Sequence, residues 1–474
     1  MPFGFSDSRF DGFALQHRFE ITDEGRVFYR SRRTCDEYIQ NIQNTGRVNI
    51  TFGQKDLCDS MFYKFFTMFK SDSADTNRNV QVTLTPNFPA GPKLTEQSHR
   101  NKAGVRNLYV KTDANALRSL DPVTLDPVES LNYATIIPEL KGAASTAAHP
   151  AVDPDTGELF NFTLKFGRSA TYTLFKLIPA TAEEASTHKL LATITDAPAA
   201  YIHSVCLTRK YFIFCVWQAD YKLNGATIPY HKNLCEAFGA WNLDRKTLWY
   251  IVDRDEGGVI RKFESDPFFA FHHINSYDEG DDVVVDLVTF PTHEVVHSFY
   301  LDMLRSSTAT KGLDPPPSVT RIRLPKVTES QSVGTGIITK TPVFLELPTI
   351  ASGYSLRPNK YVYGVSGRDL SSLWDCILKV DLEALHSNPT APPEMAIKCY
   401  ERPKCTPSEP IFVPRPGATK EDDGVVLFVE LDGLKGSSAL VVIDAQSFKE
   451  IGRAEVEGKG IVIPHGFHGV WCNI

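Results

Sequence analysis

Short runs of apolar residues, many of them alternating with polar ones, dominate the hydrophobic pattern of this chain. They are rich in Val, Phe, Tyr and Ile, are bounded by Gly, Pro, Asp and Asn, and include residues 25–32, 79–84, 211–217, 282–290, 424–431 and 439–445. A period of two is typical of strands, and long runs with helical periodicity are scarce. The pattern therefore predicts an all-β protein.

A short hairpin signature recurs along the chain. It consists of an apolar residue, Asp, two further residues, Thr or Ser, and a second apolar residue, with the aspartates Asp121, Asp244 and Asp444 and a degenerate copy at Asp381. An aspartate in this position caps a tight turn, and the next strand begins after it. The spacing fits a repeat of about sixty residues, which favours the hairpin-built blades of a propeller over a sandwich.

One segment, residues 55–70, departs from the strand pattern because its apolar residues recur at roughly helical spacing between charged ones. It is too polar to span a bilayer, so we expect either a helix packed on the core or a helix lying on a membrane surface.

Composition narrows the class of protein. The 474 residues include 50 basic and 57 acidic side chains, a formal net charge of −7, which disfavours nucleic-acid binding. The N-terminal residues lack the features of a signal peptide, and no stretch approaches the roughly 18 uninterrupted apolar residues of a transmembrane helix. The nine cysteines form no Cys-x-x-Cys pair, so we interpret them as reduced thiols of a cytoplasmic protein. No feature marks a domain boundary, and residues 1–474 are interpreted as a single domain.

Four of the thirteen histidines lie at the edges of strand-like runs: His149, His203, His272 and His468. They are too far apart for a local ligand motif, so only the fold can bring them together, as the innermost strands of a propeller would. Taken singly, each is more often an ordinary histidine. As a set of four neutral ligands they suit Fe, Cu or Zn, and ligand identity alone does not separate iron from zinc.

Three carboxylates are candidate partners for these histidines. A metal-bound imidazole usually donates its other N–H to a carboxylate or carbonyl, which fixes its tautomer. Glu346, Glu409 and Asp113 are lone acids among apolar or small neighbours, where an unpaired charge would be costly. Taken singly, each is more often an ordinary carboxylate of a loop or turn.

Residues 293–297 read HEVVH, a literal match to the H-E-x-x-H pattern of zinc proteases, in which Glu294 would be the base. The pattern specifies only three positions, its two valines are mediocre helix formers, and no motif for a third ligand follows. We therefore favour an ordinary helix or loop at this position, and keep the protease as a remote alternative.

Longer motifs resemble the carotenoid cleavage oxygenases, a family that includes the retinal pigment epithelium isomerase and plant and fungal apocarotenoid-forming enzymes. The matching segments follow the family's order along almost the whole chain, and include FDGFALQHRFE (10–20), VKTDAN (110–115), AAHPAVDPDTGELFNF (147–162), IHSVCLTRKYFIF (202–214), FHHINSYDEGDDVVVDL (271–287), LELP (345–348), SEPIFVPRPGATKEDDGVVL (408–427) and PHGFHGVW (464–471). The resemblance implies a seven-bladed β-propeller with a helical and loop dome over the iron-bearing face.

The resemblance also implies a set of site residues. The family's Fe(II) ligands correspond to His149, His203, His272 rather than His273, and His468 rather than His465. The glutamates that hold the ligands correspond to Glu346, Glu409 and position 113, where this chain has an aspartate, one methylene shorter, that would reach its histidine directly or through water. Thr112 is the candidate for shielding one open iron position.

By resemblance, the enzyme cleaves a conjugated C=C bond of a carotenoid or apocarotenoid with O2, giving aldehyde products of the apocarotenal or retinal type, and needs Fe(II) but no organic cofactor. Stilbene-cleaving members carry a lysine and a tyrosine for the phenol; residues 31–39 contain no lysine, so we favour a polyene. A carotenoid- or retinoid-binding protein without turnover is the other alternative, although binding alone would not need four histidines.

Two further expectations concern the membrane and the N-terminus. By resemblance, the mouth of the substrate tunnel would dock peripherally on a membrane through residues 55–70, with the side chains of Met61, Phe62, Phe65, Phe66 and Phe69. Family members usually carry several tens of residues before the FDG motif, which here begins at Phe10, so we expect the first strands of the family fold to be missing.

Overall fold

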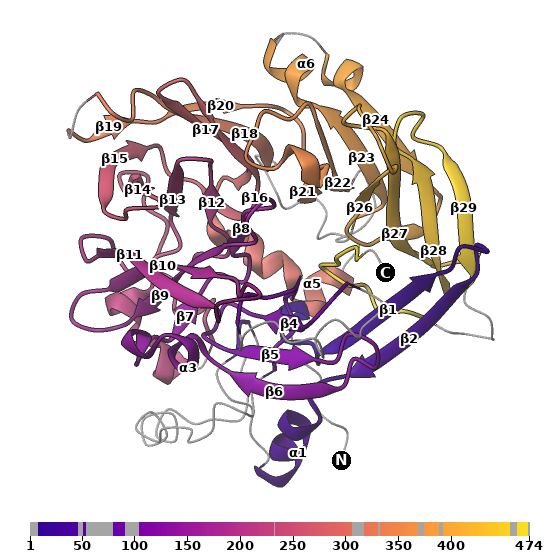
Figure 1. The fold of residues 1–474 in the computed structure, drawn as a ribbon, viewed down its shortest axis with the longest axis horizontal. Helices are drawn as coiled ribbons and strands as arrows, with labels where there is room; N and C mark the ends of the chain where they lie inside the picture. The colour runs from indigo at the N-terminus through magenta and orange to yellow at the C-terminus, as the bar shows by residue number, and fades with distance from the viewer. Residues whose placement is uncertain are drawn as a thin grey trace.

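The computed structural model describes residues 8–45, 51–53, 79–90, 104–231, 233–305, 317–329, 332–367, 374–387, 392–455 and 462–472. Six sheets of four or five strands stand around a common axis as the blades of a propeller (Figure 1). The expectation of an all-β propeller is therefore confirmed. The segment 55–70, with Met61, Phe62, Phe65, Phe66 and Phe69, lies outside the described residues.

The first three blades follow one another along the chain. Blade 1 contains β3 (Thr83–Pro86), β4 (Leu108–Lys111), β5 (Leu117–Leu120) and β6 (Pro127–Leu131). Blade 2 contains β7 (Ser145–Thr146), β8 (Ala151–Val152), β9 (Leu159–Lys165), β10 (Thr171–Ile178) and β11 (Thr187–Ile194). Blade 3 contains β12 (Cys206–Leu207), β13 (Tyr211–Val216), β14 (Thr247–Asp253) and β15 (Val259–Ser265), with β19 (Gly334–Thr335) added in parallel to β15.

The last three blades complete the series. Blade 4 contains β16 (Phe269–Glu279), β17 (Asp282–Phe290), β18 (Ser318–Leu324) and β20 (Ile337–Lys340). Blade 5 contains β21 (Glu346–Thr349), β22 (Tyr361–Ser366), β23 (Cys376–Asp381) and β24 (Ile397–Glu401). Blade 6 contains β25 (Cys405–Pro407), β26 (Ile411–Pro414), β27 (Gly424–Asp432), β28 (Ser437–Asp444) and β29 (Glu450–Glu455).

The expectation of seven blades is wrong, because the described residues form six. β1 (Leu15–Ile21) and β2 (Val27–Arg33) pair antiparallel from Leu15↔Arg33 to Ile21↔Val27, and no other described strand joins them. In Figure 1 this two-stranded sheet lies between blade 6 and blade 1. The count of seven was what the family resemblance implied, and the described strands β1 and β2 form a sheet of two rather than a further blade of four or five strands.

The turn signature itself is borne out at two of its four positions. Asp121 accepts from the backbone N–H groups of Val123 and Thr124 at 2.8 and 2.7 Å, and Asp444 accepts from Ser447 N at 2.7 Å. At the third copy, Asn242 accepts instead, from Asp244 N at 2.9 Å. The degenerate copy at Asp381 caps a helix, since it accepts from Ala384 N at 2.9 Å.

The helices are short. They are η1 (Arg9–Asp11), α1 (Asp36–Thr45), α3 (Tyr133–Ile136), η4 (Pro138–Leu140), η5 (Lys222–Gly225), α4 (Ile228–His231), η6 (His293–Phe299), α5 (Leu301–Arg305), η8 (Ser352–Tyr354), α6 (Leu382–Ser387) and η9 (Pro393–Ala396). No helix among the described residues has the length and apolar character needed to cross a bilayer.

The core lies between neighbouring blades, because their faces pack on one another. All six residues of β13 are buried, as are six of the seven residues of β9. The rings of Phe162 and Phe214, one from each strand, lie 4.9 Å apart between their centroids. A strand covered on both faces needs apolar side chains on both, which explains why these segments read as continuous apolar runs rather than alternating ones. Each fully buried phenylalanine contributes about 2–3 kcal/mol.

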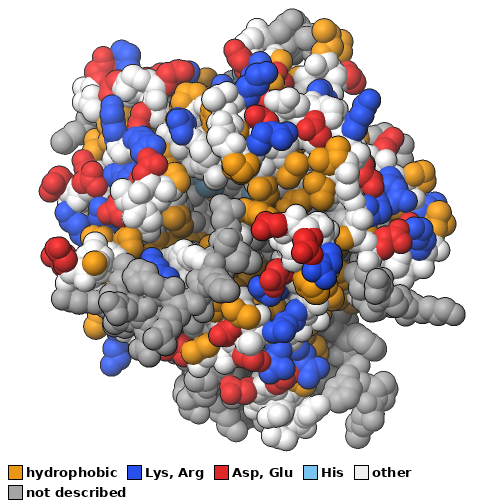
Figure 2. All heavy atoms as spheres, turned by 45° about the vertical axis from the view of Figure 1, so that its right-hand side comes forward, with side chains coloured by type: hydrophobic (Ala, Val, Ile, Leu, Met, Phe, Trp, Pro, Cys, Tyr) orange, Lys and Arg blue, Asp and Glu red, His pale blue; other side chains and the backbone are white. Residues whose placement is uncertain are grey.

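The face drawn in Figure 2 carries Lys and Arg side chains interspersed with Asp and Glu, and hydrophobic side chains gather beside a hollow near its middle. Several of the molecule's surface charges form pairs, such as Arg323 with Asp282 at 2.7 Å and Lys435 with Glu455 at 2.7 Å. Exposed pairs of this kind contribute little individually, about 0–1 kcal/mol.

Candidate metal centre

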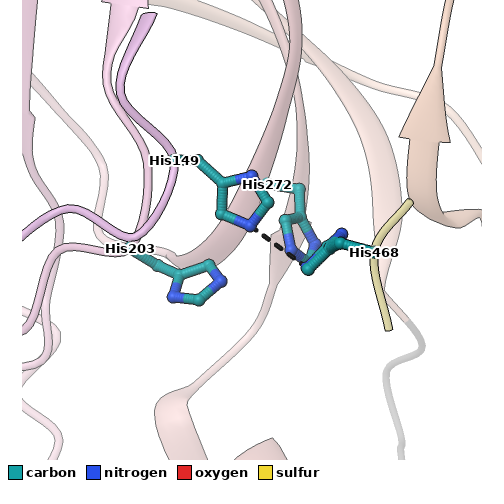
Figure 3. A group of neighbouring side chains, drawn as sticks. All are labelled: His149, His203, His272 and His468. Carbon is teal, nitrogen blue, oxygen red and sulfur yellow. Dashed lines mark hydrogen bonds between the residues drawn. The ribbon is translucent and has the colours of Figure 1, made fainter. Parts of the chain in front are cut away.

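The structure brings four histidines from distant parts of the chain to one place near the propeller axis. His149 lies between β7 and β8, His203 just before β12, His272 within β16, and His468 in the C-terminal segment 462–472. One nitrogen from each ring belongs to a group whose members all lie within 4.8 Å of one another, as Figure 3 illustrates. These are the four residues that the sequence analysis selected; their role as ligands stays a prediction.

Each of the four rings contacts at least two of the others. The Nε2 atoms of His149 and His468 are 3.1 Å apart. Ring centroids are separated by 4.7 Å for His149 and His203, 5.1 Å for His203 and His272, and 5.0 Å for His272 and His468. Four imidazoles this close together suit a single cation that all of them contact.

Each of the three candidate acids contacts a different histidine of the group. His203 Nδ1 lies 2.8 Å from Asp113 Oδ1, and His272 Nδ1 lies 2.7 Å from Glu346 Oε2. The third pair joins His468 Nδ1 and Glu409 Oε1 at 2.9 Å. With Nδ1–H donating to a carboxylate, Nε2 keeps its lone pair for the centre of the group, which is the tautomer that a metal ligand needs. Asp113 contacts its histidine directly although it is a shorter acid.

The buried polar atoms of the group fit a bound metal. His272 Nε2 is inaccessible to solvent and has no hydrogen-bond partner in the described part of the chain. A buried nitrogen without a partner costs free energy, and a cation held by the four rings would supply the missing interaction. The donor set of four neutral nitrogens, with three of the opposite ring nitrogens bound to acids, fits a borderline transition metal.

Glu346 is held by a strained stretch of backbone. Leu347, the next residue, has a positive φ of 48°, and its N–H donates to Glu346 Oε2 at 2.7 Å. The pairing of β21 with β22 shifts register between Glu346 and Thr349. A branched residue with positive φ is uncommon, so the backbone here is bent to aim both the carboxylate and its N–H donor. Sequence reasoning missed this feature.

Burial and neighbouring charges keep His149 neutral. Burial is the largest cause that lowers its pKa well below the usual value, followed by His468, His203, His272 and Lys111. A neutral imidazole is the form that binds a metal, so this shift favours ligation. Lys111 and His149 also line a pocket of about 310 Å³, and burial lowers the pKa of Lys111 to about 7.

An aromatic wall lies beside the metal group. The Phe271 ring is 5.7 Å from that of His203, and Phe10 contacts Phe52 at 4.6 Å and Phe299 at 4.9 Å between centroids. These side chains come from β16, the N-terminal segment and η6. An apolar wall at a metal group excludes water and suits an apolar substrate.

The histidines that the sequence analysis set aside lie outside the metal group found among the described residues. His465 Nδ1 donates to Gly466 O at 2.8 Å, and His273 does not belong to the metal group found among the described residues. His293 of the HEVVH segment lies in a 3-10 helix, where its Nε2 donates to Gly239 O at 3.1 Å. That nitrogen is already used, so this geometry gives no support to a zinc-protease site. Thr112 is half-buried between Lys111 and Asp113, and its shielding role stays a prediction.

Sequence reasoning also missed two residues. Tyr201 contacts His203 of the metal group, and Lys111 lines a pocket together with His149. Each stands two residues before a selected residue: Tyr201 before His203, and Lys111 before Asp113. In extended chain, residues two apart point to the same side. That spacing is the signal that could have revealed both.

A family model described as retinal pigment epithelial membrane protein matches residues 2–473. The chain belongs to this family of carotenoid oxygenases. Among its relatives, torulene dioxygenase of Gibberella fujikuroi is 34% identical over 508 residues, which cover 98% of this chain and 84% of that protein. Carotenoid dioxygenase of Neurospora crassa is 35% identical over 523 residues, which cover 97% of this chain and 81% of that protein.

More distant members of the carotenoid oxygenase family also match along nearly the whole chain. β,β-Carotene 15,15'-dioxygenase of Mus musculus is 29% identical over 503 residues, which cover 96% of this chain and 82% of that protein. Among solved structures, a mutant of the Synechocystis apocarotenoid oxygenase matches with a TM-score of 0.76 at 22% identity, covering 99% of this chain and 89% of that one. This likeness supports the propeller fold.

Proposed function

We propose that this protein is a non-haem Fe(II) dioxygenase that cleaves one conjugated C=C bond of a carotenoid or apocarotenoid with O2 and releases aldehyde products. The observation that carries the proposal is the group of four histidines within 4.8 Å, three of them bound to carboxylates. The family membership and the names of the fungal relatives, torulene dioxygenase and carotenoid dioxygenase, support the substrate class.

His149, His203, His272 and His468 would hold the iron. Bound Fe(II) would supply the activation of O2, which the side chains cannot perform. The three carboxylates would fix the tautomer and orientation of their histidines. The aromatic wall that contains Phe52 and Phe271 would position the polyene and keep water out. Thr112, beside Asp113, would shield one open iron position.

The test is anaerobic purification with metal analysis, followed by incubation in air with micelles of torulene, of β-carotene and of a hydroxylated stilbene, and chromatography of the products. We expect about one iron per chain and an aldehyde from a carotenoid. Cleavage of the stilbene alone would contradict the substrate class, and iron without any product would favour a binding protein.

The ligand set has its own test. His203→Ala should lose the iron, because it removes one of the four nitrogens and leaves the Asp113 carboxylate without its imidazole partner. His188→Ala is the matched control, since His188 lies on β11, outside the metal group. Full iron occupancy in the His203 variant would contradict the assignment.

We propose in addition that the protein docks peripherally on membranes through residues 55–70. The support is the sequence pattern, in which large apolar side chains, among them Met61, Phe62, Phe65, Phe66 and Phe69, lie between charged ones. Replacing Phe65 and Phe66 with Ser should reduce co-sedimentation with liposomes. Phe28→Ser on β2, a phenylalanine that is 53% exposed, is the control. Equal co-sedimentation of all variants would contradict the docking segment.

A further inference from the structure

The three carboxylates of the metal group are held in two different ways. Glu346 Oε2 accepts from Leu347 N, and Glu409 Oε2 accepts from Gly469 N, both at 2.7 Å. Asp113 has a weaker backbone contact, because Ala148 N lies 3.3 Å from its Oδ1. The shortest of the three acids therefore lacks the close backbone donor that fixes the other two.

The Asp113 carboxylate accepts a hydrogen bond from a side-chain hydroxyl, whereas the carboxylates of the two glutamates accept close hydrogen bonds from backbone N–H groups. Tyr201 Oη donates to Asp113 Oδ2 at 3.0 Å, and the same oxygen lies 2.8 Å from His203 Nδ1. His203 Nδ1 in turn lies 2.8 Å from Asp113 Oδ1. Tyr201, Asp113 and His203 thus form a closed triangle of polar atoms, and they are 2, 9 and 5% exposed.

We infer that Tyr201 is a positioning residue of the metal centre, whose hydroxyl compensates for the shorter reach of Asp113. The inference rests on the proposed function, because it assumes that His203 binds a metal. The hydroxyl proton goes to Oδ2, which leaves Oδ1 to accept the Nδ1–H of His203. His203 is thereby held in the tautomer whose Nε2 carries the lone pair. Without the hydroxyl, Oδ2 would have no hydrogen-bond donor among the described residues, and the carboxylate would be held only through Oδ1.

The ring of Tyr201 serves a separate purpose. Its centroid is 5.2 Å from that of Phe52 and 6.5 Å from that of Phe271. A phenylalanine at position 201 keeps these ring contacts and removes only the hydroxyl. Tyr201→Phe is therefore a test of the hydrogen bonds and not of the packing.

The experiment measures the dissociation constant of Co(II) by competition with a chelator, on metal-free protein refilled with Co(II), together with the Co(II) absorption spectrum. For Tyr201→Phe we expect affinity about 10- to 100-fold weaker, as for other losses of a group that orients a ligand, and an altered Co(II) spectrum. Tyr133→Phe is the control: its hydroxyl is also buried, but it accepts from Asn161 Nδ2 at 3.2 Å. That variant should keep wild-type affinity and spectrum.

A longer acid at position 113 separates positioning from general damage to the fold. In an Asp113→Glu background the carboxylate reaches further, so Tyr201→Phe should weaken Co(II) binding much less than it does beside Asp113. Affinity of Tyr201→Phe within twofold of wild type would overturn the inference, as would an equal loss in Tyr133→Phe or an undiminished loss in the Asp113→Glu background. If Asp113→Glu does not fold, the comparison of the two tyrosine variants still decides. Wild-type protein that binds no Co(II) would instead contradict the proposed function, and the inference with it.

Discussion

Replacing Lys111 with Met should stabilise the metal-free protein at low pH. The Lys111 side chain is buried, with 2% of the residue exposed, and its ammonium group donates to Thr85 Oγ1. Among the described residues no carboxylate pairs with it, and burial lowers its pKa from 10.5 to about 7. The protonated Lys111 side chain therefore lowers the stability of the folded protein, and a methionine would fill a similar volume without charge.

The size and the pH dependence of the effect follow from this lowered pKa. Below pH 7 the Lys111 amine is protonated in both the folded and the unfolded protein, so the full free-energy cost of burying the charge applies. Between pH 7 and 10.5 the unfolded chain holds a proton that the folded protein lacks, so the free energy of unfolding rises with pH. A pKa lowered by about 3.5 corresponds to about 5 kcal/mol, at about 1.36 kcal/mol for each pH unit. Loss of the hydrogen bond to Thr85 offsets about 1 kcal/mol, so the variant should gain about 3–4 kcal/mol at pH 6.

Urea unfolding of both proteins at pH 6 and pH 9.5, with a chelator present, measures this difference. At pH 9.5 the penalty on Lys111 falls to about 1–2 kcal/mol, so most of the gain should be gone. Lys176→Met is the contrasting control, because Lys176 is buried but paired with Glu158 at 2.8 Å and should be needed for stability. A variant at position 111 no more stable than wild type at pH 6, or a gain that persists at pH 9.5, would refute the reasoning.

Three further outcomes are expected. Glu346→Ala should weaken metal binding about 10- to 100-fold in a chelator competition, because His272 loses the acceptor 2.7 Å from its Nδ1; Glu394→Ala, on the surface, should not. Gly364→Ala should cost about 1–3 kcal/mol in urea unfolding, since its Cβ would lie 2.4 Å from Leu345 Cγ, whereas Gly452→Ala meets only ordinary contacts. Arg254→Met should cost about 3–5 kcal/mol in the same assay because it leaves Asp153, 2.6 Å away, buried without its partner; a loss below about 1 kcal/mol would contradict this.

Some residues of the candidate site could be predicted from the sequence, and others could not. The four histidines were found because each lies near the edge of a strand-like run, within motifs that resemble one family. The three acids were found as isolated charges among apolar neighbours. Tyr201 was missed because a tyrosine in an apolar segment gives no charge signal, and only its spacing from His203 would have marked it.

The class of fold could be predicted from the sequence, but the number of blades could not. Alternation and turn residues are local, so they predicted strands and hairpins; Asp121 and Asp444 cap turns as expected. The count of seven blades came from the family resemblance, and patterns that mark single strands and turns do not tell how many consecutive strands pair into one sheet. The positive φ of Leu347 is likewise imposed by the fold, since leucine has no preference for that conformation.

Charge explains why these acids and histidines suit a metal together. Asp113, Glu346 and Glu409 each accept hydrogen bonds, and among the described residues none of them pairs with a lysine or arginine. The group therefore combines neutral nitrogens facing inward with acids behind them, and a divalent cation offsets the acids' charge. Because the histidines come from blades 2, 3 and 4 and from the segment after blade 6, only the folded ring assembles this arrangement.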